Sequence, residues 1–225
     1  MDSGYDNPAA VGKLILQGKH RELIGGLWDE IGQLQLDFLM SRGLLPHHKL
    51  LDIGCGVFRD GVKLIPYLDP GGYWGIDKND ALLNVGWDLE IKRYGLASRQ
   101  PREQLVCLDD FEFSRLGVRF DYAIAQSLFT HLSLNRIRRC LARLAPCLIE
   151  GGRLYASFFE VAPGQGREDD QVHMPGGMTS RSDRAFYHYD MDDFAFVARD
   201  LPLRVDRIGD WGHPRGQKML MMTRL

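Results

Sequence analysis

The chain has 225 residues, of which 44% are apolar and 26% charged, a composition typical of globular proteins that excludes wholesale disorder. Its 28 Lys and Arg residues nearly balance 30 Asp and Glu residues, so the net charge of -2 provides no general attraction to nucleic acid. The four cysteines form no C-x-x-C pair and no His/Cys cluster at zinc spacing, so we expect neither a disulfide framework nor a metal site. The sequence shows no apolar signal-peptide core and no run of about 18 apolar residues, which predicts a cytoplasmic protein.

The first predicted element is a helix over residues 20–43, where apolar residues recur at steps of three and four. Gly25 and Gly26 mark a weak point in it, and Gly43 marks its end. We assign residues 1–46 to an N-terminal helical cap and residues 47–225 to the main domain. Short apolar runs then predict buried strands at 49–53, 73–76, 105–108, 122–125 and 154–159, and helices at 59–68, 81–94 and 134–148 separate them.

Strands that alternate with helices predict a Rossmann-like, mostly parallel sheet with helices on both faces. The end of the chain departs from this pattern. Asp190 is a suitable cap for a helix to about Arg199, and the segments LRVDRIG and KMLMMT then predict two strands joined by DWGHPRGQ. This connection is too short for a parallel crossover, so the last two strands must be antiparallel. The predicted fold class is α/β, with a seven-stranded mostly parallel sheet and an antiparallel C-terminal hairpin.

The loop after the first strand contains two glycines, Gly54 and Gly56, which allow the backbone to approach a ligand closely. Asp77 ends the second strand 21 positions after Gly56, the placement of a carboxylate that binds ribose hydroxyls. The third strand is followed by residues 109–111 (Asp-Asp-Phe), which suit an adenine ring. Tight structural turns also produce glycine pairs, but the agreement of three strand ends favours an adenosine-containing ligand.

The identity of that ligand depends on residues around the glycine pair. A dinucleotide pyrophosphate requires a third glycine three residues after the second, and Arg59 occupies that position. Asp52 at the strand end would repel a diphosphate but tolerates an amino group or a sulfonium. A nicotinamide-dependent oxidoreductase is therefore disfavoured, and titration with NAD(H) would test that alternative.

The segments LLDIGCG, GIDKND, CLDD, FDYAIAQSLFTHL and EGGRLYASFF, in this order, resemble the successive motifs of class I S-adenosylmethionine-dependent methyltransferases. The resemblance covers residues 47–160, and the terminal hairpin by topology. The segments GKHRELIGGLWDEIG and GDWGHPRGQKML resemble a group of small bacterial methyltransferases. Residues 55–58 depart from the family pattern, because a third loop glycine is often found there.

This resemblance implies S-adenosyl-L-methionine as the cofactor and S-adenosyl-L-homocysteine as the product. By motif position, Gly54 and Gly56 surround the methionine part, and Asp77 binds the ribose hydroxyls. Either Asp109 or Asp110 binds the adenine amine. The full expected cofactor-binding set is Asp52, Gly54, Cys55, Gly56, Asp77, Lys78, Asp109, Asp110, Phe111 and Gln126, the last beside the sulfonium.

Methyl transfer is an in-line displacement, for which the site must hold donor and nucleophile in line. A base is needed only when the nucleophile carries a proton. The segment after the fourth strand lacks the motif [DNS]-P-P-[FY], which disfavours methylation of amino groups on bases. It also lacks a close pair of glutamates, which disfavours guanidinium methylation. No carboxylate pair follows that could hold Mg²⁺, which disfavours metal-dependent methylation of catechols. His131 in this segment is the candidate catalytic base; a histidine that only fixes the loop is the alternative.

Residues 160–189 form a stretch too long for an ordinary loop, and we expect a lid or substrate insertion there; a disordered insertion is the alternative. The turn between the last two strands should lie on the same side of the sheet as this insertion. Arg215 in that turn suits a carboxylate or phosphate on the substrate. The alternative is that the turn is only well packed. Candidate substrate-binding residues are His173, Tyr187, His188, His213 and Arg215. His20, Arg21 and Trp28 of the cap are secondary candidates, for which a solvated face is the alternative.

The sequence thus predicts a methyltransferase that acts on an O or N atom of a small molecule. A non-methylating protein, in which S-adenosylmethionine is structural or sensed, is the alternative. The expected partner is a small-molecule substrate, with no nucleic acid and no membrane; a homodimer stays open. The arginine cluster over residues 136–143 interleaves with apolar residues and lacks an exposed aromatic platform, so we interpret it as a solvated helix face.

Overall fold

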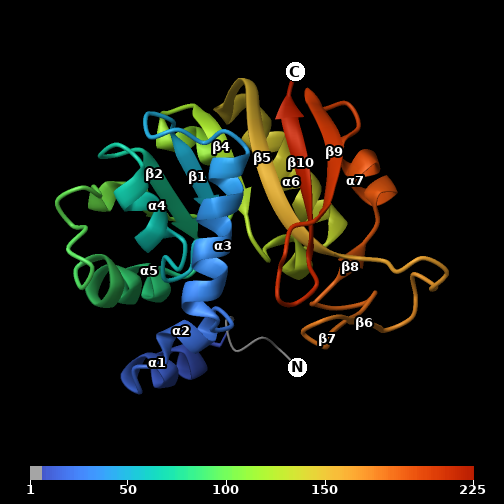
Figure 1. Cartoon of the computed structure of the whole chain (residues 1–225), viewed down its shortest axis with the longest axis horizontal. Helices are drawn as coiled ribbons and strands as arrows, with labels where there is room; N and C mark the ends of the chain where they lie inside the picture. The colour runs from blue at the N-terminus through green and yellow to red at the C-terminus, as the bar shows by residue number, and fades with distance from the viewer. Residues whose placement is uncertain (1–6) are drawn as a thin grey trace. The chain divides into compact units, whose positions relative to one another are not determined.

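A computed structural model describes residues 7–225 of the chain (Figure 1). The chain divides into two compact units, Met1–Asp110 and Phe111–Leu225. Within residues 7–225, no helix combines the length and the apolar character needed to cross a bilayer.

The first unit begins with three helices, α1 (Pro8–Leu16), α2 (His20–Leu23) and α3 (Trp28–Ser41). The predicted single helix over residues 20–43 is wrong, because the chain breaks at the two glycines that marked its weak point. Gly25 and Gly26 have φ of +86° and +64°, a left-handed conformation that interrupts a right-handed helix. Helix α1 has no counterpart in the sequence prediction; the side chain of Asn7 caps it by accepting from the N–H groups of Ala9 and Ala10.

Three parallel strands form the sheet of the first unit, in the order β3-β2-β1: β1 (Leu50–Ile53), β2 (Tyr73–Asp77) and β3 (Leu105–Cys107). All four residues of β1 are buried, as expected for a parallel strand covered on both faces. Between these strands lie α4 (Gly61–Tyr67), α5 (Asp80–Gly86), the π-helix η2 (Trp87–Ile91) and the 3-10 helix η3 (Arg102–Gln104). The predicted helix over 81–94 therefore changes to a wider turn after Gly86.

The sheet of the second unit has the order β4-β5-β10-β9. Strands β4 (Phe120–Ala125) and β5 (Leu148–Glu160) are parallel, with α6 (Leu134–Leu144) between them in sequence. Strand β10 (Lys218–Arg224) is antiparallel to both β5 and β9 (Leu203–Asp210), which confirms the predicted terminal hairpin. The 3-10 helices of this unit are η4 (Phe113–Leu116), η5 (Phe129–His131) and η6 (Ala145–Cys147).

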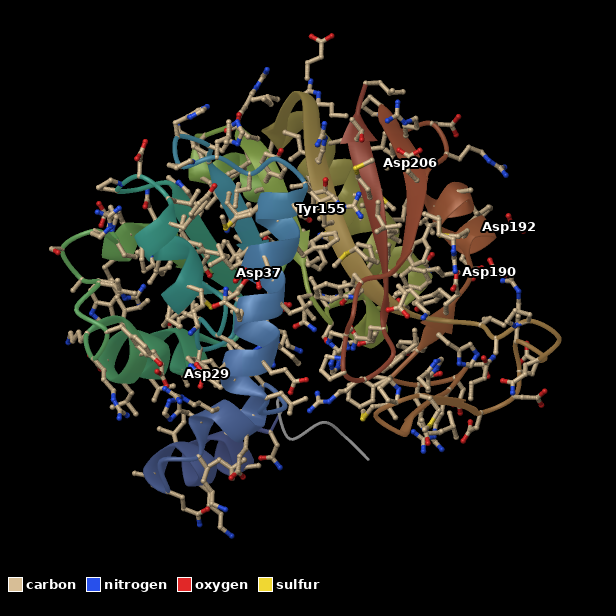
Figure 2. All side chains as sticks on the ribbon, viewed as in Figure 1. Asp29, Asp37, Tyr155, Asp190, Asp192 and Asp206 are labelled. Atoms are coloured by element: carbon tan, nitrogen blue, oxygen red, sulfur yellow. The ribbon has the colours of Figure 1, made fainter. Side chains whose placement is uncertain are left out.

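The insertion between β5 and α7 folds into strands of its own. Strands β6 (Gln171–His173) and β7 (Met178–Ser180) form an antiparallel hairpin, and β8 (His188–Tyr189) pairs in parallel with the end of β5. Helix α7 (Met191–Ala198) then starts at Asp190, whose side chain accepts from the N–H groups of Asp192 and Asp193, as predicted for this cap. Figure 2 labels Asp190 and Asp192 at this helix start.

The core of the second unit is rich in aromatic side chains. The rings of Phe158 and Phe194 meet edge to face at 4.8 Å, which places α7 against β5. Tyr155 (Figure 2) is fully buried at the middle of β5. Because the pleat of β5 is fixed by this core, the orientation of the residues at its carboxyl end is fixed as well.

Candidate functional site

The glycine loop after β1 is held by backbone hydrogen bonds and by one carboxylate. Gly54 and Gly56 adopt left-handed φ of +84° and +56°. The N–H of Gly54 donates to the carbonyl of Ile76 at 2.8 Å. Asp77 at the end of β2 is buried, and it accepts from the N–H of Gly56 at 3.0 Å and from the N–H of Asn79 at 2.9 Å. The two positions that the sequence relates at a distance of 21 residues are thus in direct contact.

Phe58 belongs to the segment 55–58, which departs from the family pattern that the sequence resembles, and it has a left-handed φ of +67°. Two glycines elsewhere make room for its fully buried ring. A Cβ at Gly86 would lie 2.7 Å from Phe58 Cδ2, and a Cβ at Gly61 would lie 2.9 Å from Phe58 Cβ. The departure from the family pattern is therefore accommodated by packing and leaves the loop in its left-handed form.

A pair of buried carboxyl groups lies behind the glycine loop. The hydroxyl of Tyr73 donates to Asp52 Oδ2 at 2.7 Å. Burial and the neighbouring Asp60 raise the pKa of Asp52 well above its usual range, and burial also raises the pKa of Asp60. These two carboxyl groups therefore bind a proton more readily than exposed aspartates do. Burial likewise raises the pKa of the Cys55 thiol, which stays neutral.

The glycine loop is covered by the break between α2 and α3. Arg59 donates to the carbonyls of Ile24 at 3.1 Å and Gly26 at 3.0 Å. A Cβ at Gly56 would lie 2.6 Å from Ile24 Cγ2, so only glycine fits beneath this side chain. Arg59, whose position in the sequence disfavours a diphosphate ligand, thus links the glycine loop to the segment between α2 and α3.

Two cap residues, His20 and Arg21, contact Glu90 of η2, which is 1% exposed. Glu90 accepts from His20 Nε2 at 2.6 Å and from two nitrogens of Arg21 at 2.7 and 2.6 Å, which raises the pKa of Arg21. The guanidinium of Arg21 also lies 4.1 Å from the ring centroid of Trp28. His20 Nδ1 and Trp28 Nε1 are buried and have no hydrogen-bond partner among the described residues. Buried polar atoms are usually hydrogen-bonded, so these two atoms are candidate ligand contacts.

The other predicted cofactor residues are spread over the ends of β2, β3 and β4. Cys107 Sγ lies 3.5 Å from the carbonyl of Lys78, which brings the ends of β3 and β2 together. Asp109 is exposed and Asp110 half-buried after β3. In the second unit, Phe111 is buried, with the guanidinium of Arg136 5.3 Å from its ring centroid.

The end of β4 is fixed by a buried network of side chains. Ser127, which has φ of +58°, donates its N–H to Ser157 Oγ at 2.7 Å. Ser157 donates to Gln217 Oε1 at 2.6 Å, and Gln217 Nε2 donates to Ser127 Oγ at 2.8 Å. The network joins the end of β4 to β5 and to the start of β10.

The terminal turn reaches the same network through His213, which is buried. His213 Nε2 lies 3.0 Å from the side-chain amide of Gln126, and the N–H of Arg215 donates to His213 Nδ1 at 3.2 Å. The ring of Trp211 stacks on His213 at 5.3 Å, and Trp211 Nε1 donates to the carbonyl of Gln217 at 3.0 Å. Burial lowers the pKa of Arg215. Gln126, His213 and Arg215, which lie far apart in the sequence, are thus brought together.

His131 is exposed in η5, next to the end of β4. Its ring contacts Phe186 of the insertion edge to face at 4.7 Å. The N–H of Tyr187 donates to the carbonyl of Thr130 at 2.7 Å, so the insertion returns to this strand end. Tyr187 is half-buried and stacks on Tyr189 at 6.1 Å. The candidate base and one predicted substrate residue therefore lie on the same edge of the second unit.

His173 and His188 lie inside the insertion and are joined by Ser180. His173 Nε2 is 2.6 Å from Ser180 Oγ, and Ser180 Oγ is 2.9 Å from His188 Nδ1. His188 Nε2 lies 2.8 Å from the carbonyl of Arg167. His188 uses both ring nitrogens in this chain, so the structure gives it a place in the hydrogen-bonded interior of the insertion.

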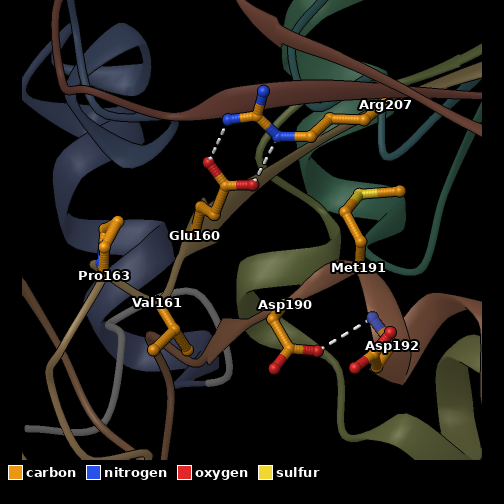
Figure 3. Close-up of a pocket in the computed structure, with 7 residues that line it drawn as sticks. All are labelled: Glu160, Val161, Pro163, Asp190, Met191, Asp192 and Arg207. Carbon is orange, nitrogen blue, oxygen red and sulfur yellow. Dashed lines mark hydrogen bonds and ion pairs between the residues drawn. The ribbon is translucent and has the colours of Figure 1, made fainter.

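A shallow pocket elsewhere on the second unit contains none of the predicted residues (Figure 3). Its charged groups pair with one another: Arg207 donates to the two oxygens of Glu160 at 2.8 and 2.7 Å, and Asp190 caps α7. We therefore do not assign a ligand to it. In residues 7–225, no group of three or more His, Cys, Asp or Glu side chains is arranged to hold a metal ion.

No model of a known protein family matches the chain, whereas solved structures do. Magnesium protoporphyrin IX methyltransferase from Synechocystis PCC 6803, with bound S-adenosylmethionine, aligns over 87% of this chain and 81% of its own, at 17% identity and a TM-score of 0.60. An amino pentose methyltransferase from Micromonospora echinaspora aligns over 96% of this chain and 97% of its own, at 16% identity and a TM-score of 0.62. An S-adenosylmethionine-dependent methyltransferase from Clostridium acetobutylicum aligns over 98% of both chains, at 13% identity and 0.62.

The chain has the S-adenosylmethionine-dependent methyltransferase fold. This confirms the fold class that the sequence motifs predicted, and all seven predicted strands form. The sequence interpretation missed Glu90, Ser127, Ser157, Ser180 and Gln217. Single polar residues in apolar runs, such as Ser157 in YASFF, were the available signal for part of this set.

Proposed function

We propose that the protein transfers a methyl group from S-adenosyl-L-methionine to an O or N atom of a small molecule. A fold alone hosts many functions, so the proposal rests on the site. The observation that carries it is the contact between Asp77 and the N–H of Gly56, which places a buried carboxylate against the glycine loop. That pairing suits a ligand with a ribose next to an amino-acid chain.

The residues of the first unit fit this cofactor. Asp77 would hold the ribose hydroxyls, and Gly54 and Gly56 would lie along the methionine part. The Asp52–Asp60 pair, whose pKa values are raised by burial, lies behind this loop. Trp28 Nε1, a buried donor without a partner, would meet the carboxylate of the amino-acid part, and His20 Nδ1, whose ring donates from Nε2 to Glu90, would accept from its amino group. When bound, the cofactor supplies an electrophilic methyl group.

The residues of the second unit would orient the acceptor. The network around Ser157 holds the end of β4, and with it Gln126, in one position. His131, exposed beside this strand end, would accept the proton of a hydroxyl nucleophile. Arg215 would bind an anionic group on the acceptor. Roles for Gln126 and His131 at the end of β4 would explain why Ser127, which has a left-handed φ, is fixed there by hydrogen bonds.

Two related structures support a small acceptor, since their names describe methylation of an amino pentose and of magnesium protoporphyrin IX. The same proposal places the protein in the cytoplasm, because its four cysteines are free thiols. It includes neither nucleic acid nor a membrane as a partner. Size-exclusion chromatography with light scattering would decide between a monomer and a homodimer.

Calorimetric titration with S-adenosylmethionine, with NAD(H) as the comparison ligand, tests the cofactor. We expect binding of the former alone; tighter binding of NAD(H) would overturn the proposal. Extracts incubated with labelled methyl donor then test transfer. Binding without S-adenosylhomocysteine release on any acceptor would favour the alternative, in which the cofactor is structural or sensed.

His131→Ala separates the two roles considered for this residue. As a base, its loss should lower turnover at least about tenfold and leave S-adenosylmethionine affinity unchanged. A parallel loss of melting temperature and activity would instead assign it to loop structure.

A further inference from the structure

The β6–β7 hairpin and its turn bury polar side chains and expose apolar ones. Gln171, His173 and Ser180 are buried, whereas Val172 and Met174 are 63% and 71% exposed. This is the reverse of ordinary strand burial, and polar groups tolerate it only when they are hydrogen-bonded. The hairpin is therefore organised around its hydrogen bonds.

When His188 is neutral, the donor and acceptor groups fix the direction of each hydrogen bond in the chain from Arg167 to His173. His188 Nε2 faces the carbonyl of Arg167, an acceptor only, so this nitrogen carries a hydrogen. In neutral His188 the Nδ1 is then an acceptor, and Ser180 must donate to it. The Ser180 oxygen in turn accepts from His173 Nε2. His173 therefore has its hydrogen on Nε2 and a lone pair on Nδ1.

The remaining nitrogen of this chain, His173 Nδ1, has no hydrogen-bond partner among the described residues and is not among their fully buried polar atoms. Burial, with the nearby His188, lowers the pKa of His173 to about 4, so the ring is neutral at pH 7. Phe159 stacks on the ring at 4.4 Å and holds its plane. The neutral ring of His173 is thus held in place, and its Nδ1 is available to accept a hydrogen bond.

His173 belongs to the edge that carries His131. Phe159, which stacks on His173, lies 6.4 Å from Phe186, and Phe186 lies 4.7 Å from His131. The turn of the same hairpin also packs on the terminal turn: a Cβ at Gly176 would lie 2.8 Å from the Cα of Arg215. Ring contacts through Phe186 and the fully buried Phe159 therefore connect His131 to His173.

We propose that His173 Nδ1 binds the acceptor substrate by accepting a hydrogen bond from a hydroxyl group, and that Ser180 and His188 are positioning residues that fix its tautomer. This rests on the proposed function, because it assigns the edge at His131 to the acceptor. A bare imidazole nitrogen accepts a hydrogen bond and therefore selects a donor. The substrate class is therefore a small molecule that carries a hydroxyl group.

Nitrogen-15 NMR of the labelled chain, saturated with S-adenosylhomocysteine, tests the first part. His173→Gln and His188→Gln spectra assign the two rings among the seven histidines. We expect His173 to show a protonated Nε2 and a bare Nδ1 at pH 7, and Ser180→Ala to mix its tautomers. A protonated Nδ1 in the unaltered chain would overturn the proposal. Failure of S-adenosylhomocysteine to bind would instead contradict the proposed function.

Catechol and its dimethyl ether, 1,2-dimethoxybenzene, test the second part, because only catechol carries a hydrogen-bond donor. We expect catechol alone to shift the Nδ1 resonance of His173. His173→Gln, which keeps an amide near Ser180 but lacks the Nδ1 atom, should weaken catechol binding about tenfold and leave S-adenosylhomocysteine affinity unchanged. His173→Asn, which restores an acceptor near the Nδ1 position, should recover part of the loss.

Thr179→Val, on the opposite face of the hairpin, is the matched control and should leave catechol affinity unchanged. Equal shifts with both probes would overturn the proposal, as would no shift with catechol. The proposal is also overturned if His173→Gln binds catechol as tightly as the unaltered chain does.

Discussion

The loop edge of the first unit and the loop edge of the second unit are held in place by different groups. In the first, backbone N–H groups of the glycine loop bond to Asp77 and to the carbonyl of Ile76. In the second, side chains bond to side chains, and Gln126 and Ser127 meet partners 87 and 90 residues away in the sequence. The Gly56–Asp77 pair of the first edge is 21 residues apart in the sequence, whereas the second edge joins segments about four times as far apart.

This difference matches what each edge is proposed to bind. A cofactor is the same molecule in every turnover, and backbone groups that recognise it do not change when a side chain is replaced. An acceptor differs from one enzyme to another, and contacts made by side chains can change one at a time. We therefore expect loss of the Asp77 carboxylate to abolish most of the cofactor affinity of the first edge. At the second edge, replacing one side chain should weaken acceptor binding only in part.

The largest expected effect comes from Asp77→Ala, which breaks the first edge. S-adenosylmethionine affinity should fall at least about 100-fold, because the ribose hydroxyls lose a charged acceptor and the N–H groups of Gly56 and Asn79 lose theirs. Calorimetric titration measures it. Asp80→Ala, which removes an exposed carboxylate bonded to Asn84, is the control and should bind normally. Unchanged affinity in Asp77→Ala would remove this residue from the site.

Gly56→Ala should lower the free energy of unfolding by about 3 kcal/mol, because the new Cβ combines a left-handed φ with a collision against Ile24. Urea unfolding measures this change. Gly95→Ala, with φ of +70° and open space around it, isolates the backbone cost and should lose about 1 kcal/mol. Ile24→Ala should recover part of the loss in Gly56→Ala; equal losses at both glycines would show that the cap does not press on the loop.

Ser157→Ala tests the second edge. It removes the acceptor of the Ser127 N–H and the donor to Gln217, so the free energy of unfolding should fall by about 1–2 kcal/mol with S-adenosylmethionine affinity nearly unchanged. Ser133→Ala is the matched control, because the Ser133 side chain makes no capping hydrogen bond to α6. If both alanine variants unfold at the same urea concentration, the network does not stabilise this edge.

The smallest effect concerns the dependence of stability on pH. Above pH 6.5, His173 is neutral in the folded and the unfolded chain. As the pH falls from 6.5 towards 4, the unfolded chain gains a proton that the folded chain does not, so stability decreases through this window. His173→Gln removes this contribution, and its urea midpoint should depend less on pH between 6.5 and 4. The same slope in both proteins would contradict the lowered pKa of His173.

Contacts between neighbouring strand ends could be predicted from the sequence, because strand ends in a parallel sheet lie along one edge. The pairing of Gly56 with Asp77 and the cap at Asp190 follow from such local rules. The Glu90 contacts and the Ser157 network could not be predicted, since each joins residues that share no sequence pattern. The hairpin at Val172 reverses the usual burial, so a rule based on alternation would place the wrong face inside.

Strand β10 lies between β5 and β9, although it follows both of them in the sequence. During synthesis on the ribosome, β5 and β9 therefore emerge with unpaired backbone edges that face no neighbour. Such edges readily pair with strands of other chains. The second unit can complete its sheet only after residue 224 has left the exit tunnel, so one edge of β5 has no strand partner until the chain is almost fully made.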